Sequence, residues 1–137
     1  MIVPSHLHLL SGTEPTPGQV CAGFKLMHFY ENGQITDVAN VAYFKFDGTW
    51  HRICLEASTV FWRCDDPPQI PENSDLASGL ILNDLSGVTS VVGHNLDSLK
   101  YEENEDEVIA TVYFTGGGSV VLRYLIDLDC TEILLGS

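Results

Sequence analysis

The feature of this sequence that most limits its fold is a succession of short β-branched and aromatic runs that end at turn signals. Residues 40–46 form such a run and stop at Asp47-Gly48, a dipeptide typical of tight β-hairpins. Residues 50–56 then alternate between the two faces of a strand, and residues 59–64 follow after a short break. These runs predict a three-stranded antiparallel meander over residues 41–64.

A second hairpin is predicted by the runs 107–114 and 119–126, which are joined by Thr115-Gly116-Gly117-Gly118. Glycine readily adopts positive φ angles, so we expect the three glycines to supply the angles of a tight reversal. A turn is favoured over a phosphate-binding loop here, because no Lys-Ser/Thr follows the glycines and a strand comes next. Residues 19–30 predict one further long strand, which ends at the turn Glu31-Asn32-Gly33.

The segment between these blocks has a different composition. Residues 65–72 are rich in proline and predict a connection outside any central strand ladder. Asn73-Ser74 predicts the cap of a short helix through Leu85, and residues 88–92 predict a further strand. The fold class is therefore mainly β: an antiparallel sandwich or curled half-barrel of meanders and hairpins, with at most one or two short helices.

Length and composition favour a single domain over residues 1–137. Hydrophobic residues make up 45% of the chain, which is enough for a packed core and argues against disorder. The sequence predicts neither a membrane-spanning helix nor a secretory signal, so we expect a cytoplasmic protein. Four cysteines would allow two disulfides in three connectivities, but in that compartment we expect reduced, buried thiols.

Charge is distributed unevenly along the chain. The formal net charge is -13, and residues 65–107 contain eleven acids against one base, Lys100. Such a field attracts a cationic partner and repels nucleic acid or an anionic membrane. We assign the partner-binding surface to acids of this half together with one tryptophan: Asp65, Asp66, Glu72, Asp75, Glu102, Glu103, Glu105, Asp106, Glu107 and Trp62.

Trp62 belongs to one of two Trp-Arg segments, Trp50-His51-Arg52 and Phe61-Trp62-Arg63. Trp and Arg are enriched at binding hot spots, because a large ring and a planar guanidinium bury well. The competing interpretation is that both tryptophans fill the core while the arginines pair with neighbouring acids. Both interpretations remain open at this point.

Catalytic and metal-binding patterns are weak. His6 and His8 would project from one face of a strand, but no carboxylate or third histidine completes a metal site, and His94 lies in no matching motif. Asp127 and Asp129 alternate without the further ligands of a calcium loop. No nucleophile motif surrounds any cysteine or serine. We therefore expect neither an enzyme nor a cofactor.

The chain resembles the immunity proteins of bacterial polymorphic-toxin and contact-dependent growth inhibition systems. The resemblance covers the whole chain in size, acidity and lack of catalytic motifs, and includes the meander with Gly48-Thr49-Trp50-His51-Arg52 followed by Phe61-Trp62-Arg63. It implies a cytosolic protein that binds and neutralises a basic partner, most naturally a nuclease-type toxin. Immunity families share no common motif, so no contact residues are carried over.

Three alternatives stay open. The first is a small-molecule-binding β-barrel whose cavity is lined by Phe24, Phe44, Phe46 and Tyr113. The second is a metal-dependent enzyme that uses His6 and His8. The third is a DNA mimic that inhibits a DNA-binding protein through the same acidic surface.

Overall fold

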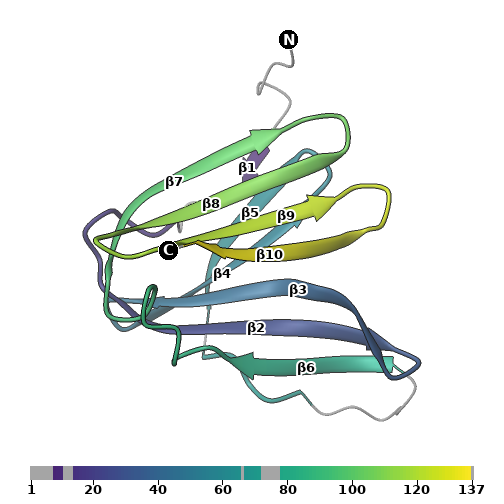
Figure 1. Ribbon diagram of the computed structural model, residues 1–137, viewed down its shortest axis with the longest axis horizontal. Helices are drawn as coiled ribbons and strands as arrows, with labels where there is room; N and C mark the ends of the chain where they lie inside the picture. Colours follow the sequence, from purple (N-terminus) through teal and green to yellow (C-terminus); the bar gives the residue numbers. More distant parts are fainter. Residues whose placement is uncertain (1–7, 11–13, 66, 72–77, 137) are drawn as a thin grey trace.

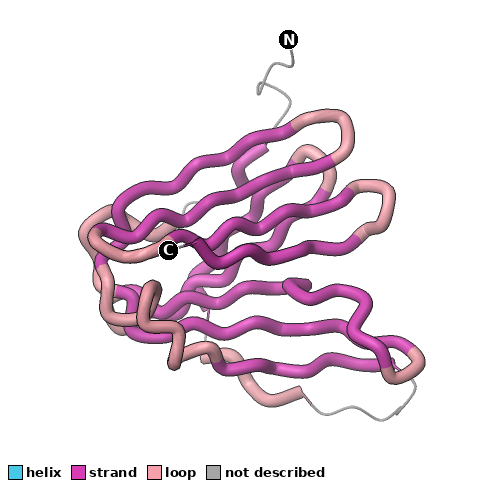
Figure 2. The backbone as a smooth tube through the Cα atoms, in the orientation of Figure 1, coloured by secondary structure: helices cyan, strands magenta, loops and turns pink. Residues whose placement is uncertain are grey.

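The computed structural model describes residues 8–10, 14–65, 67–71 and 78–136. Its regular structure consists of β-strands joined by turns (Figures 1 and 2). The strands are β1 (His8–Leu10), β2 (Cys21–Glu31), β3 (Gln34–Phe46), β4 (Thr49–Glu56), β5 (Thr59–Asp65), β6 (Ser78–Asp84), β7 (Asn95–Glu103), β8 (Glu107–Thr115), β9 (Ser119–Leu125) and β10 (Cys130–Gly136).

The strands form two sheets that pack as an open sandwich, as the sequence predicts. Sheet A has the order β1-β5-β4-β3-β2-β6, and sheet B has the order β10-β9-β8-β7. All neighbouring strands are antiparallel except β1 and β5, which pair in parallel. In Figure 1, sheet B lies in front of β4 and β5, and β10 runs alongside β3.

The predicted meander and hairpins are confirmed. β3, β4 and β5 pair consecutively, and the side chains of β4 alternate between buried and more exposed positions. The turn at Asp47-Gly48 has positive φ at both residues, as a tight hairpin requires. The second hairpin pairs β8 with β9, and the long strand β2 ends at a turn in which Asn32 and Gly33 also have positive φ.

Two predictions for residues 73–92 are wrong. Residues 78–84, which the sequence assigns to a helix, form strand β6 along the edge of β2, while residues 73–77 lie outside the described part. The long β2 edge offers a row of backbone partners, and these outweigh a weak local helix preference. Residues 88–92 form tight turns rather than a strand, with the Val88 carbonyl accepting from the amides of Val91 and Val92.

The core lies between the sheets and is built around stacked aromatic rings. Phe24 and Phe44 stack with ring centroids 4.8 Å apart, and Phe46 and Phe114 extend the cluster. Truncating one of these buried rings to alanine would cost about 3–5 kcal/mol. The cavity lining proposed for a small-molecule barrel is therefore wrong, because the three β2–β3 phenylalanines pack together and Tyr113 lies on the outside, 38% exposed.

Trp62 is a core residue that links the two sheets. Its side chain is 1% exposed, and its indole N–H donates to the Tyr101 hydroxyl on β7 at 2.7 Å. The Tyr101 hydroxyl in turn donates to the Glu14 carboxylate. Of the two interpretations of the Trp-Arg segments, the core interpretation holds for Trp62, and its place in the partner-binding set was wrong.

Candidate functional site

Four turns meet at one end of the sandwich. They join β2 to β3, β4 to β5, β7 to β8 and β9 to β10, and they lie at the right of Figure 1. The strand directions require this arrangement, because the isolated bridge between Val20 and Asn95 brings the starts of β2 and β7 together at the other end. Segments far apart in the sequence therefore share one surface.

Acidic side chains gather at this end of the molecule. We call this surface the acidic end and define it by Glu31, Asp37, Glu56, Glu102, Glu103, Glu105, Asp106, Glu107, Asp127 and Asp129. Two bases pair with these acids: the Arg123 guanidinium lies 2.7 Å from the Glu107 carboxylate, and the Lys100 ammonium lies 3.7 Å from that of Glu102. A third base, Arg52 on β4, acts electrostatically on Cys54 of the same strand. The end therefore keeps a strong excess of negative charge.

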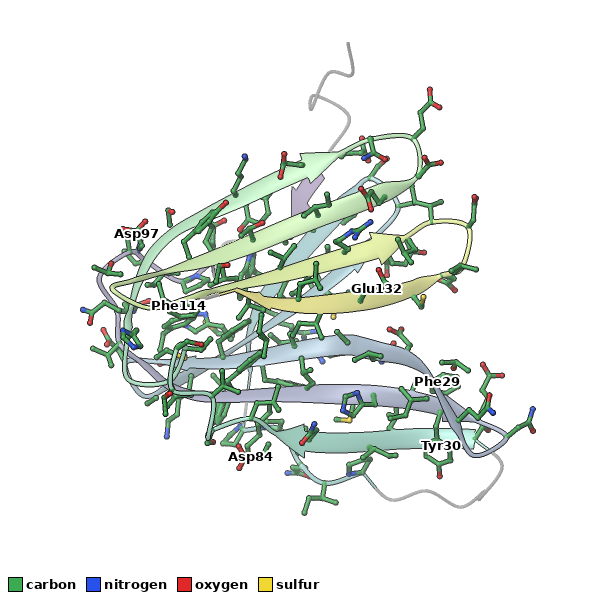
Figure 3. The ribbon with its side chains drawn as sticks, viewed as in Figure 1. Phe29, Tyr30, Asp84, Asp97, Phe114 and Glu132 are labelled. Carbon is green, nitrogen blue, oxygen red and sulfur yellow. The ribbon has the colours of Figure 1, made fainter. Side chains whose placement is uncertain are left out.

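A cavity of about 560 Å³ opens within the acidic end. It forms because β3 pairs with β4 only from Ala42 onward, so the first half of β3 turns away from β4 and toward β10. The β9–β10 turn closes one side, and Phe29, at the turn end of β2 in Figure 3, contributes to the wall. Its lining includes Glu31, Asp37, Glu56 and Asp129 but, among the described residues, no Lys or Arg.

Asp37 connects the two sheets at this cavity. Its carboxylate accepts a hydrogen bond from the Thr131 backbone N–H of β10 at 2.9 Å. Burial raises the pKa of Asp37 above its ordinary value, the bonds from the Thr131 and Ala39 amides oppose the rise, and the charge of Asp129 adds to it. The site therefore holds a negative charge that its surroundings do not fully compensate.

The carboxylates of the cavity also raise the pKa values of neighbouring groups. The Tyr124 hydroxyl donates to the Asp129 carboxylate at 2.6 Å, and this bond, with burial and nearby carboxylates, raises the pKa of Tyr124 to about 12. Burial raises the pKa of the Cys130 thiol, and the charge of Asp37 contributes further. A cation placed in the cavity would be attracted from several sides at once.

The ridge formed by residues 102–107 turns without a glycine. The side-chain carbonyl of Asn104 accepts from the backbone amides of Asp106 and Glu107 at 2.8 and 3.0 Å, which makes the reversal between β7 and β8. The Ile126 amide donates to the Asp106 carbonyl, so this ridge adjoins the β9–β10 turn. Glu105 and Asp106 are exposed, whereas Glu107 is held by Arg123, whose hydrogen bonds lower the pKa of Glu107.

The structure brings together only part of the predicted site. Glu102, Glu103, Glu105, Asp106 and Glu107 belong to the acidic end. Asp65 ends β5 at the opposite end of the sandwich, and its side chain is not described. The other predicted acids lie outside the described residues: Asp66, Glu72 and Asp75.

Sequence reasoning missed Glu31, Asp37, Glu56 and the cavity role of Asp129. Each is an isolated acid at or near a turn, and the sequence shows no run that would group them. One signal for these acids was present in the sequence, namely the regular spacing of the predicted turns. Alternate turns of a meander fall at the same end of a sheet, so acids near alternate turns are expected to share one end of the molecule.

The metal and nucleophile alternatives gain no support. His6 lies outside the described residues, the His8 side chain is not described, and His94 contacts the Thr115 carbonyl at 3.2 Å. No three His, Cys, Asp or Glu side chains of the described chain converge as a metal-binding group. All four cysteines are described and none forms a disulfide; Cys21 is buried, but Cys64 is exposed, contrary to the expectation of buried thiols.

Comparisons with known proteins found no match to this chain among protein-family models, curated proteins or solved structures. Among the described residues there is no helix with the length and hydropathy needed to cross a lipid bilayer.

Proposed function

We propose that this protein binds a basic protein and neutralises it by covering a cationic surface with the acidic end. The observation that carries the proposal is the cavity whose wall holds four carboxylates and, among the described lining residues, no balancing Lys or Arg. A basic side chain of the partner that enters this cavity would supply the missing positive charge. Binding would then relieve the repulsion that the carboxylates exert on one another.

An arginine of the partner fits the cavity best. Its guanidinium is planar and offers hydrogen-bond donors in two directions. Asp37 and Asp129 come from facing elements of the two sheets, so their carboxylates match these two directions. Charge-assisted hydrogen bonds of this kind are worth about 1.5–3 kcal/mol each in protein interiors. The cavity would therefore contribute to the lifetime of the complex.

The exposed ridge has a different role. Glu102, Glu105 and Asp106 project into solvent beside the cavity, where their field acts over about 8–10 Å at physiological salt. Complementary fields raise association rates toward about 10⁸–10⁹ M⁻¹s⁻¹. The ridge would steer the partner, and the cavity would hold it.

The finer part of the proposal is that the partner is a cognate toxin and that this chain is its immunity protein in the cytoplasm. Size, acidity and the resemblance described above support it. A nuclease must hold phosphates in a cationic groove, so an acidic protein can block it by using the same electrostatics. Rapid capture also suits a target that is toxic until it is bound.

The test takes as its probe a basic protein whose gene adjoins the gene of this chain, prepared in a catalytically inactive form, and measures its binding. We compare Asp37→Asn/Glu56→Gln/Asp129→Asn with the control Asp47→Asn/Asp84→Asn/Asp97→Asn by surface plasmon resonance. The two triple variants change net charge equally, and Asp84 and Asp97 lie away from the four turns (Figure 3). We expect the cavity variant to weaken binding at least tenfold and the control by less than threefold.

Equal losses in the two variants would contradict the cavity as the binding site, because net charge alone would then explain them. A complex that is insensitive to salt between about 50 and 500 mM would contradict an electrostatic interface altogether. Reversing Glu102, Glu103, Glu105 and Asp106 to lysine should slow association. An unchanged association rate would remove the ridge as the steering surface.

A further inference from the structure

Strand β4 loses one of its two neighbours before it ends. On one side it pairs with β5 from Trp50 to Glu56. On the other side its ladder with β3 ends at the pair Ala42–Ile53, and the two ribbons separate from there toward the acidic end (Figure 1). Residues 54–56 of β4 line the cavity, and no strand of the described chain pairs with them on that side.

The hydrogen-bond pattern of β4 turns the backbone of Leu55 toward the cavity. In an antiparallel ladder, every second residue exchanges both backbone hydrogen bonds with its partner. Phe46 and Thr49 form such a pair, because they flank the two-residue turn 47–48. The same alternation points the N–H and C=O of Ile53 toward β3. Leu55 is next in this series, at a position that β3 has already left.

The pairing of β4 with β5 gives the same result. Glu56 and Thr59 flank the two-residue turn 57–58, so the backbone groups of Glu56 point toward β5. Those of Leu55, one residue earlier, point the opposite way. The side chain of Leu55 is buried in the core, while its backbone N–H and C=O face the cavity. Such an open edge is a template for one more strand.

A bulge in β3 makes this separation part of the fold. Between two successive register pairs, β2 advances by two residues, from Met27 to Phe29, while β3 moves by four, from Val41 to Asp37. Extra residues in one strand bend it and increase its local twist. The open edge of β4 is therefore built into the sheet by strand register.

We infer that an extended segment of the basic partner docks on this edge of β4 as a short additional strand and places an arginine in the cavity, an inference that rests on the proposed function. Strand addition to an open edge is a common way to bind an extended peptide, with backbone hydrogen bonds for affinity and side-chain pockets for specificity. The segment takes the place that residues 39–41 would occupy if β3 continued along β4. Its backbone pairs with the N–H and C=O of Leu55.

The available space suits such a segment. Residues 54–56 span about 10 Å in extended form, which matches about three residues of an added strand. The cavity volume of about 560 Å³ lies within the range of about 300–1,000 Å³ that is typical of ligand pockets. Successive side chains of a strand point to opposite faces, so one side chain of the segment enters the cavity while its neighbours point away.

The charges beside the edge select a basic segment. Asp37, Glu56 and Asp129 line the cavity with Leu55, and none of the three forms a salt bridge within the described chain. An apolar segment would displace water from these carboxylates without replacing its hydrogen bonds. A second copy of this chain would bring its own net charge of -13. A basic side chain supplies both the donors and the positive charge.

The experiment follows backbone amides of the full chain by NMR, free and bound to the same inactive basic protein. Leu55 reports the open edge, Ile53 the paired part of the same strand, and Gly48 an exposed turn at the opposite end. In the free chain we expect the Leu55 amide to exchange with water at least tenfold faster than that of Ile53. In the complex its exchange should slow at least tenfold and its proton resonance should move downfield, as a new hydrogen bond requires, while exchange at Gly48 changes less than twofold.

Free-chain exchange as slow at Leu55 as at Ile53 would overturn the inference, because the edge would already be paired. Binding that leaves Leu55 exchange unchanged would also overturn it, and would leave the proposed function intact. Slower exchange without the downfield shift would show that a side chain covers the edge without pairing, and equal slowing at Gly48 would show a general effect of binding; either result overturns strand addition. If the basic protein does not bind, the proposed function fails and the inference with it.

Discussion

Among single residues, the glycines of the β8–β9 turn serve two different structural needs. Only Gly116 of the three has a positive φ, at 68°, so the expectation that all three supply such angles was wrong. Gly117 and Gly118 are needed because neighbouring backbone leaves no room for a side chain at either position. A Cβ on Gly118 would lie 2.0 Å from the Gly136 carbonyl oxygen, and one on Gly117 would lie 2.5 Å from that of Ser90.

Gly118→Ala should therefore destabilise the protein by about 2 kcal/mol or more, because the clash is with backbone that cannot move without breaking the β9–β10 ladder. Gly87→Ala is the matched control, since a Cβ there would meet no atom within 4 Å. Its effect should stay within about 0.5 kcal/mol. Urea denaturation measures both values, and equal stabilities would contradict the close approach of the two backbones.

Among the elements, β3 decides both the fold and the cavity. Its second half pairs with β4, whereas its first half leaves β4 and approaches β10 through Asp37. The sequence analysis assigns a strand to the second half alone, because residues 40–46 are rich in aromatic residues and stop at a hairpin turn. Residues 34–39 include the β-branched Ile35, Thr36 and Val38 but no aromatic residue. A long hairpin with β2 carries the polar half along, which local propensity cannot reveal.

The raised pKa of Asp37 predicts a pH effect at this junction. A carboxyl whose folded pKa lies above its unfolded value destabilises the fold once it ionises, so its cost is present at neutral pH and disappears as pH falls through the folded pKa. Asp37→Asn keeps an oxygen to accept from the Thr131 and Ala39 amides. We expect this variant to be more stable than wild type at pH 7.

Thermal melting from pH 7 down to about 3.8, the ordinary pKa of this carboxyl, should show the difference between the two proteins shrinking toward zero. Glu107→Gln should behave in the opposite way. Its pKa is lowered by Arg123, so its carboxylate stabilises the fold at neutral pH and that contribution is lost in acid. A pH-independent gain for Asp37→Asn would contradict the burial of its charge.

At the scale of the whole molecule, charge is segregated in space rather than along the chain. Residues 65–107 hold the acidic excess in the sequence, but the acidic end combines Glu31 and Asp37 with residues 102–107 and with Asp127 and Asp129. Antiparallel strands place alternate turns at the same end, so the sandwich concentrates charges that the sequence scatters. Such a concentration weakens the fold by self-repulsion.

Salt should therefore stabilise the protein. We expect the melting temperature to rise between about 10 mM and 150 mM salt, as the screening length shortens from about 30 to 8 Å. The cavity variant Asp37→Asn/Glu56→Gln/Asp129→Asn should show a smaller rise than the control Asp47→Asn/Asp84→Asn/Asp97→Asn. Identical rises in the two variants would mean that net charge, and not its concentration at one end, sets the salt dependence.

The sequence by itself determined the all-β class, the meander over residues 41–64 and the hairpin of β8 and β9, because alternation and turn residues are local properties of the chain. Its acidic excess also predicts a basic partner, which the proposed function adopts. The tertiary structure decided that residues 78–84 pair with β2 as a strand, that Trp62 belongs to the core and that Asp37, Glu56 and Asp129 share a cavity. Those outcomes depend on which strands become neighbours. The choice of neighbours is made by backbone pairing and burial between segments that are distant in the sequence, so it is fixed only when the chain folds.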